Sequence, residues 1–151
     1  MELNKIIADL DFVSATVHNI EMTNNSSELL ESSKRSFSLD IKYNEPIVQD
    51  DKKYGGLLLE VNISVTHEDP EVSEDSIKLI MEGLFSSPST IDDDKFLELL
   101  NINGGAALYS IARAKIEAIS GLVYNEGKLL LPMINMVQYY QEKNKKENIE
   151  E

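Results

Sequence analysis

Cysteine is absent from this sequence of 151 residues, and basic residues are few. The lack of cysteine excludes disulfides, thiolate metal sites and cysteine nucleophiles, and it fits a cytoplasmic protein. Only 14 Lys and Arg accompany 27 Asp and Glu, so the net charge is −13. An acidic chain repels phosphate backbones, which disfavours a nucleic-acid partner. We interpret the negative net charge mainly as a source of solubility; an acidic docking face, or attraction of basic clients, is the less favoured interpretation.

Long apolar runs are also absent. No stretch approaches the roughly 20 residues that a membrane-spanning helix needs, so we expect no membrane insertion. The first eleven residues are interrupted by acids, unlike a signal peptide. The length fits a single domain over residues 1–151 with its own core, and the charged residues 142–151 are expected to fray.

No motif in the sequence indicates bond chemistry. His18 and His67 lie on different predicted strands and belong to no metal-binding pattern; we expect His67 at a solvated strand end. Residues 92–94, three Asp, suit a helix start better than a calcium loop. The Gly pairs at 55–56 and 104–105 lack the Lys-Ser/Thr of a phosphate loop. The pair at 55–56 indicates a β-bulge or a close approach of another segment, and the pair at 104–105 indicates a hinge before the long helix. We therefore predict no catalytic residue, no metal and no cofactor.

Four segments have the apolar content or alternation of β-strands: 10–22, 36–43, 57–66 and 77–85. The clearest places Leu57, Leu59, Val61, Ile63 and Val65 on one face. Short polar spacers, such as 50–53, favour antiparallel neighbours, because parallel pairing needs a long crossover. The segment 23–35 is rich in Asn and Ser, which is typical of a linker.

The last third of the chain is predicted to be helical. A short helix follows residues 92–94 and breaks at 101–105, and a long Ala-rich helix then runs to about Gly121. Its small side chains permit another helix to approach closely. Pro132 fits the first turn of a final helix. The prediction is an α+β fold: a four-stranded antiparallel sheet followed by a long and a shorter C-terminal helix.

This order of elements and two short motifs resemble the SecB family of protein-export chaperones. Leu108-Tyr109-Ser110-Ile111-Ala112-Arg113 is similar to the opening of that family's long helix, although the family often has Pro where Ser110 stands. Leu-Leu-Leu-Pro-Met-Ile-Asn at 129–135 resembles the family's approach to its last helix, where an aromatic residue often replaces Met136. The crossing segment 23–35 has no aromatic residue, whereas the family has an aromatic-rich groove beside it.

The resemblance implies an ATP-independent chaperone, or holdase, that binds unfolded or nascent polypeptides for export. It implies a cytoplasmic homotetramer, a dimer of dimers with sheets outward and long helices between, and the SecA translocation ATPase as a candidate partner. A dedicated chaperone of a toxin–antitoxin or mobile-element system, which shields one partner, stays open as the alternative. A structural scaffold also stays open, and an enzyme is disfavoured for lack of a site.

Three sets of residues are assigned. Met and Tyr side chains suit a flexible, unselective binding surface, although a stripe of such residues along a helix also fits a core. The predicted polypeptide-binding set is Leu129, Leu131, Met133, Met136, Tyr139 and Tyr140. The predicted oligomer interface is Leu108, Ala112, Ile116 and Ile119. The candidate docking residues for the motor are Asp40, Glu60 and Glu82, which point away from the apolar face. Met136→Asp or Tyr140→Asp is expected to weaken client holding more than folding.

Overall fold

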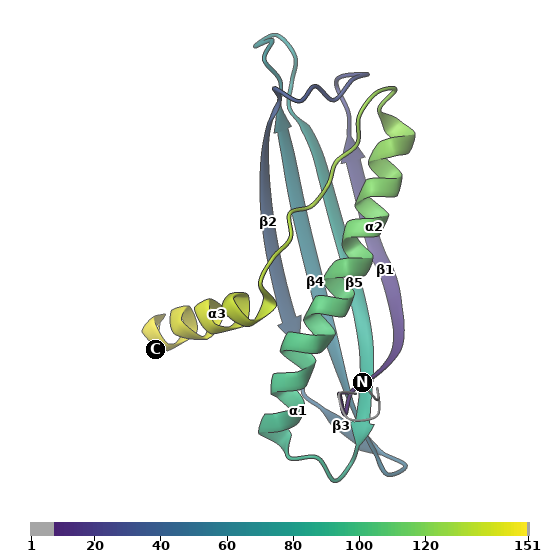
Figure 1. Ribbon diagram of the computed structural model, residues 1–151, viewed down its shortest axis with the longest axis vertical. Helices are drawn as coiled ribbons and strands as arrows, with labels where there is room; N and C mark the ends of the chain where they lie inside the picture. Colours follow the sequence, from purple (N-terminus) through teal and green to yellow (C-terminus); the bar gives the residue numbers. More distant parts are fainter. Residues whose placement is uncertain (1–7, 151) are drawn as a thin grey trace, which may run out of the picture.

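The structure, a computed structural model, describes the backbone of residues 8–150 and the side chains of residues 8–145 (Figure 1). Its strands are β1 (Asp11–Thr23), β2 (Lys34–Tyr43), β3 (Ile47–Gln49), β4 (Lys52–Thr66) and β5 (Asp75–Pro88). Its helices are α1 (Asp93–Leu99), a π-helical turn η2 (Leu100–Gly104), α2 (Gly105–Val123) and α3 (Met136–Glu150). The predicted α+β class and the order of the elements are confirmed.

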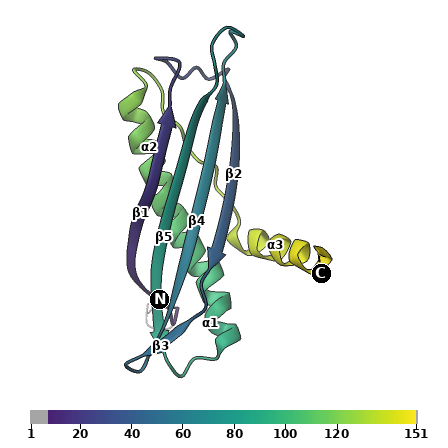
Figure 2. The ribbon, with the colours of Figure 1, turned by 180° about the vertical axis from the view of Figure 1, so that it is seen from behind.

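The strands form one antiparallel sheet in the order β1-β5-β4-β2, with the short β3 paired to the start of β4 (Figure 2). The sequence did not predict β3. It forms because Asp50 and Asp51 both adopt positive φ, 49° and 59°, and close a two-residue hairpin. The polar turn predicted over 50–53 is therefore confined to these two residues, and β4 begins at Lys52.

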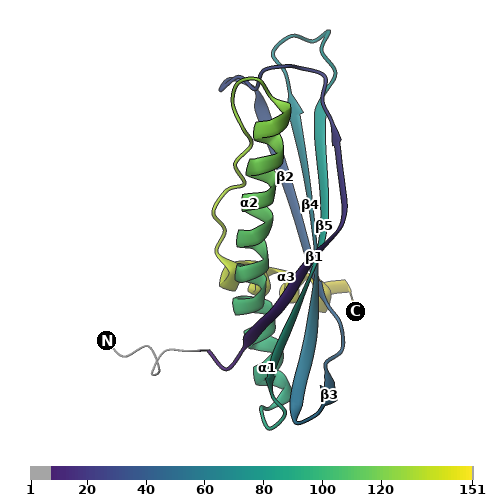
Figure 3. The same ribbon diagram turned by 90° about the vertical axis from the view of Figure 1, so that its right-hand side faces the viewer.

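The core lies between one face of the sheet and α2. Figure 3 shows the two layers from the side, with α1 and α2 over one face only. The alternate residues Leu57 to Val65 of β4 are at most 2% exposed, as their period predicted. From the helix, Leu108, Ala112 and Ile116 are fully buried against them.

The helix break predicted at 101–105 is wrong, because η2 joins α1 to α2 without a gap. The glycines there permit close packing and do not form a hinge. A Cβ on Gly104 would lie 3.3 Å from Leu57 Cδ1, and one on Gly105 would lie 3.1 Å from Met136 Sδ. The extra residue of a π-helical turn shifts the phase of the helix, which lets both glycines be buried.

Gly55 is a second point of close approach, as predicted. A Cβ there would lie 2.7 Å from Leu100 Cδ2 and 2.8 Å from Phe96 Cε1, both fully buried. We expect Gly55→Ala to lower the free energy of unfolding by about 1–3 kcal/mol through overpacking, measured by urea titration. Gly121, with nothing within 4 Å of its Cβ position, is the matched control, and Gly121→Ala should be neutral or stabilising. Wild-type stability in Gly55→Ala would show that this contact is not tight.

After a turn at residues 124–127, where Gly127 has a φ of 82°, residues 128–135 return over the helix-covered face in an extended conformation and lead into α3 (Figure 1). The predicted position of Pro132 in the first turn of the last helix is therefore wrong, since α3 begins at Met136. Two side chains of α2 hold the segment extended: Tyr109 Oη donates to the carbonyl oxygen of Pro132 at 2.7 Å, and Arg113 Nε donates to that of Leu131 at 3.0 Å. Asn135 Oδ1 accepts from the amide of Gln138 at 3.1 Å and caps the new helix.

The α3 helix reaches Glu150, and fraying of residues 142–151 stays a prediction. None of the helices in the described part of the chain combines the length and the apolar character needed to cross a bilayer.

A buried polar cluster joins the crossing segment to the ends of three elements. Asp75, 1% exposed at the start of β5, accepts from Tyr124 Oη at 2.7 Å and from the amide of Asn25 at 2.6 Å. His67 Nε2 lies 3.0 Å from the same carboxylate, and its side chain is only 7% exposed. The prediction of a solvated His67 is therefore wrong: the β4–β5 connection turns its ring inward onto Asp75.

Tyr124 should make stability fall at alkaline pH. Burial raises the pKa of its hydroxyl well above the ordinary 10.0, and the hydrogen bond to Asp75 and the charge of Asp75 raise it further. The folded chain thus holds this proton more tightly than the unfolded chain, so the contribution is complete below about pH 10 and is lost as pH rises above it. We expect urea unfolding between about pH 9 and 11 to show a shallower loss of stability in Tyr124→Phe than in wild type. Parallel curves would contradict this assignment.

Candidate polypeptide-binding groove

An apolar groove lies between β2 and the extended segment that follows α2; we name it the β2 groove. Its volume is about 140 Å³. Its lining residues are Phe37, Ser38, Leu39, Val61, Tyr109, Leu131, Pro132 and Ile134. The groove exists because Tyr109 and Arg113 hold the segment away from the sheet edge through its carbonyl oxygens.

A second hollow of about 120 Å³ lies on the α2 side of the same segment. Its lining residues are Ala106, Tyr109, Ser110, Arg113, Met133, Ile134 and Met136. Tyr109 and Ile134 line both hollows and form the wall between them. A drug-sized ligand needs roughly 300 Å³ or more, so each hollow fits one or two side chains of a chain that lies across the segment.

Exposed apolar side chains surround the two hollows. Met133 is 80% exposed, Leu130 54%, Val137 43% and Phe37 39%. They come from β2 and, far from it in sequence, from the extended segment and the first turn of α3 that follows it. Together with the hollows they form an apolar surface that a foreign chain can cover.

The structure divides the predicted polypeptide-binding residues into two groups. Met133 is exposed, and Tyr139 and Tyr140 are partly buried. Leu129, Leu131 and Met136 are 1%, 3% and 6% exposed. Leu129 packs inside the protomer, whereas Leu131 still lines the β2 groove and Met136 the second hollow. Tyr139 Oη also accepts from the amide of Ile41 at 3.0 Å.

Leu130 was missed. In an extended segment successive side chains point to opposite sides, so the burial of Leu129 and Leu131 directs Leu130 outward. Reading residues 129–131 as a strand-like segment would have found it.

The expected effect of Met136→Asp needs correction. Met136 packs onto Gly105, so aspartate there would place a charge in the core and damage folding as much as holding.

The residues predicted for the oligomer interface lie on the sheet side of α2. Leu108, Ala112 and Ile116 are fully buried within the protomer, and Ile119 is half-buried. They fix the helix to its own sheet. The surface that α2 leaves for a second copy is its opposite face, whose exposed residues are Ala106, Ser110, Ala114 and Ala118.

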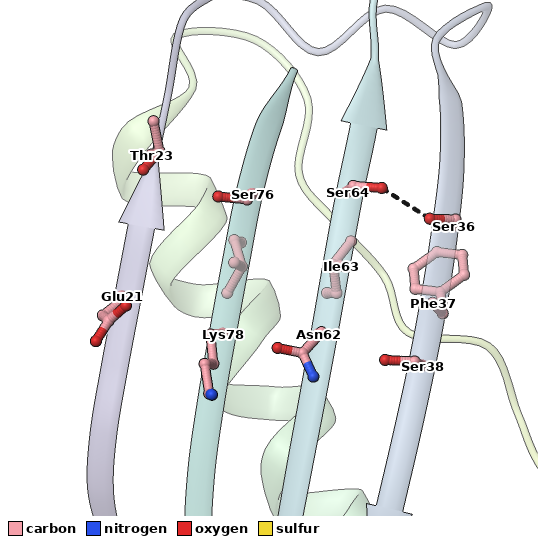
Figure 4. A pocket seen from close by; sticks show the side chains of 11 residues that line it. Glu21, Thr23, Ser36, Phe37, Ser38, Asn62, Ile63, Ser64, Ser76 and Lys78 are labelled. Atoms are coloured by element: carbon pink, nitrogen blue, oxygen red, sulfur yellow. Dashed lines mark hydrogen bonds between the residues drawn. The ribbon is translucent and has the colours of Figure 1, made fainter. Parts of the chain in front are cut away.

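The open face of the sheet is polar where Figure 4 shows it. The strand register places four hydroxyl residues in one row across the sheet: Thr23, Ser76, Ser64 and Ser36. Ser36 Oγ and Ser64 Oγ are hydrogen-bonded at 2.7 Å. The trough here has a volume of about 440 Å³. Phe37 stands at one edge of the trough, Ile63 and Ile77 are buried in its floor, and its other lining residues are all polar or charged. It therefore offers an unfolded chain less apolar contact than the β2 groove.

The three acids predicted for motor docking lie on this face, and each has a basic partner. Asp40 Oδ1 is 3.0 Å from Lys143 Nζ, Glu60 Oε1 is 3.1 Å from Lys78 Nζ, and Glu82 Oε2 is 2.8 Å from His18 Nε2.

The pKa values agree with this pairing. Partial burial raises the pKa of Asp40, but hydrogen bonds and charges from Lys143 and Lys42 outweigh it, so the pKa lies below its ordinary value. Hydrogen bonds from Asn62 and Lys78 lower the pKa of Glu60. Asp40 and Glu60 are therefore compensated by neighbouring lysines, and Glu82 has the imidazole of His18 beside it.

No protein-family model matches the sequence, and no curated protein matches it. Among solved structures, the chain is similar to the SecB-like chaperone Rv1957 of Mycobacterium tuberculosis in complex with a ChAD peptide from the HigA1 antitoxin Rv1956. The match has a TM-score of 0.58 and covers 83% of this chain and 90% of that chain, at 11% sequence identity. At this identity the likeness concerns the fold: the chain has a SecB-like fold, as the sequence motifs indicated.

Proposed function

We propose that this protein is an ATP-independent chaperone that holds unfolded or nascent polypeptides on the β2 groove and the apolar residues around it. The observation that supports this most is the exposure of Met133 and Leu130 beside two hollows of side-chain size. Apolar side chains that gather around hollows, unlike single scattered ones, mark a surface that a partner covers, and each large apolar residue contributes about 1.5–3 kcal/mol when fully buried.

The mechanism needs no bond chemistry. Each client segment that covers the groove gains roughly 25 cal/mol per Å² of apolar area removed from water, from which the cost of ordering the segment is subtracted. A single segment therefore binds weakly. Grooves on several protomers hold one client tightly, because each later segment binds at high effective concentration.

We propose the corresponding assembly as a cytoplasmic homotetramer, a dimer of dimers with the sheets outward and the α2 helices between. The exposed face of α2 supports this arrangement, since its row of Ala and Ser lets a second helix approach closely. The resemblance to SecB brings protein export and SecA as candidates. Support for a SecA site on the sheet is weaker, because Asp40, Glu60 and Glu82 already have basic partners.

A dedicated chaperone is the second candidate function. The solved SecB-like neighbour carries a peptide from an antitoxin, which favours a client range of one partner in a toxin–antitoxin or mobile-element system. The groove geometry suits both candidates, since the same apolar surface can hold many clients or one.

The test is light scattering of a denatured model protein, such as citrate synthase diluted from guanidinium, with the assembly mass measured in parallel. We expect suppressed scattering without nucleotide and a tetramer mass. Unchanged scattering would contradict the holdase and favour a scaffold. Affinity capture from cells of the source organism then separates the two client ranges: many unrelated unfolded proteins, or one.

A further inference from the structure

β2 is the outermost strand on its side of the sheet (Figures 1 and 2). It pairs with β4 from Lys34↔Thr66 to Tyr43↔Leu57 without a register shift. Near its end, side chains of α3 take both backbone groups of Ile41: its amide donates to Tyr139 Oη at 3.0 Å, and its carbonyl oxygen accepts from Lys143 Nζ. The N–H and C=O groups of Ile41 are therefore directed away from β4.

The direction of the remaining groups follows from antiparallel geometry. Every second residue of an antiparallel strand directs its N–H and C=O to the same side. With no bulge in the pairing, Arg35, Phe37 and Leu39 direct theirs outward like Ile41. Within the described part of the chain, no hydrogen bond reaches these outward groups. The edge of β2 is thus open from Arg35 to Leu39 and closed at Ile41.

This open edge lacks most of the features that usually protect one. It has no Pro and no bulge, its charged residues Lys34 and Arg35 lie at one end, and residues 36–39 carry no charge. Edge strands without such features readily pair with another chain. The open part also borders the β2 groove, because Phe37 and Leu39 line it. A strand added here would satisfy the backbone groups and direct every second side chain into the groove. Backbone pairing combined with such side-chain pockets is a known mode of peptide recognition.

The charges at the open end favour an acidic residue in the added strand. Lys34 has no ion pair within the described residues, and Arg35 donates only to the carbonyl oxygen of Leu30, at 3.1 Å. Two cations therefore stand at the open end of the edge, although the chain as a whole carries −13. These two cations favour an acidic client residue at this end of the edge, whereas the net charge of the whole chain would attract basic clients.

We propose that a client segment binds as an added β-strand along β2 from Arg35 to Leu39. The segment is extended, bulky and apolar at alternate positions, and acidic at the end that reaches Lys34. Tyr139 and Lys143 end the pairing at Ile41, which limits the paired stretch to about five or six residues. This proposal rests on the proposed function, since it specifies how the same groove holds its client.

The first test uses a fluorescein-labelled peptide, Asp-Ser-Val-Ser-Phe-Ser-Val-Ser-Asp, and two copies with methylated backbone nitrogens. One copy is N-methylated on the two Val residues and the Phe, and the other on the three Ser residues that directly follow them. In an added strand only one of these sets of amides faces β2. We expect one copy to bind at least about tenfold more weakly than the parent and the other to bind within about threefold of it.

A protein variant tests the same pairing from the other side. Phe37→Pro removes an outward N–H and leaves the hydrogen bonds to β4 intact, while Phe37→Ala removes the same ring and keeps the N–H. We expect the Pro variant to bind the parent peptide about tenfold more weakly than the Ala variant. Circular dichroism checks that both are folded. If the Pro variant does not fold, the binding of the two methylated peptides to the wild-type protein still tests strand addition.

The charge is tested with Lys at both ends of the peptide in place of Asp. The Lys peptide should bind more weakly, and the difference should shrink as salt screens it. Equal binding of both methylated peptides, or no binding of the parent peptide, overturns strand addition. Equal binding together with suppressed aggregation leaves the holdase standing, whereas loss of aggregation suppression itself would contradict the proposed function.

Discussion

Replacing Leu130 and Met133 by Asp is expected to abolish aggregation suppression while the protein stays folded. Both side chains are exposed, 54% and 80%, so two charges there disturb no packing in the protomer. Each large apolar contact with a client contributes about 1.5–3 kcal/mol, which corresponds to roughly a tenfold to hundredfold loss of affinity per residue. In the proposed assembly several grooves hold one client, so the losses would multiply across the protomers. Light scattering and urea unfolding measure holding and folding separately.

Ile47→Asp combined with Val48→Asp is the matched control for this double variant. Ile47 and Val48 are 66% and 60% exposed in β3 and line neither hollow of the groove. Both double variants add two negative charges and remove two exposed apolar side chains, so the β3 variant should leave holding unchanged. Equal loss of holding in the control and in the groove variant would show that acidic charge alone explains the effect.

Asp75→Ala is expected to lower the free energy of unfolding by about 3–5 kcal/mol. The substitution leaves the Tyr124 hydroxyl and the Asn25 amide without their acceptor, and it removes the carboxylate beside His67. Each buried donor without a partner costs about 1–3 kcal/mol. The cluster also connects the crossing segment to the end of α2, so both of these segments should become less stable in the variant. Urea unfolding gives the change in stability.

The neighbouring Glu74 provides the control for Asp75. Glu74 is exposed, and its carboxylate accepts from Thr66 Oγ1 at 2.7 Å. Glu74→Ala should change stability by no more than about 0.5 kcal/mol. If Asp75→Ala were equally mild, the buried cluster would not hold the crossing segment, and the part of the account that depends on it would be wrong.

The sheet and the long helix could be predicted because their patterns are local. Alternation over 57–66 and the period of Leu108, Ala112 and Ile116 both report which side chains face the core. Element ends were less predictable. β3 depends on two Asp residues at positive φ, an uncommon conformation for them. The start of α3 depends on Tyr109 and Arg113, which hold the preceding segment extended from another element.

The candidate site was predicted in part for the same reason. Composition indicated an apolar surface near Leu129–Met136. Which of these side chains face outward could not be predicted, because it depends on the extended conformation that contacts with α2 impose. Met133 and Leu130 face out, whereas Leu129 and Met136 face in. The contribution of β2 through Phe37 and Leu39 could not be inferred from sequence, because it depends on the path of the chain across the sheet.

The most direct measurement is site-specific photocrosslinking with a photoreactive phenylalanine analogue at positions 133, 37 and 82, in the presence of reduced, carboxymethylated lactalbumin. Positions 133 and 37 border the groove, and position 82 lies on the open face of the sheet. We expect crosslinks to the unfolded protein from 133 and 37 and none from 82. Crosslinks from 82 alone, or equal crosslinking from all three, would contradict binding at the β2 groove.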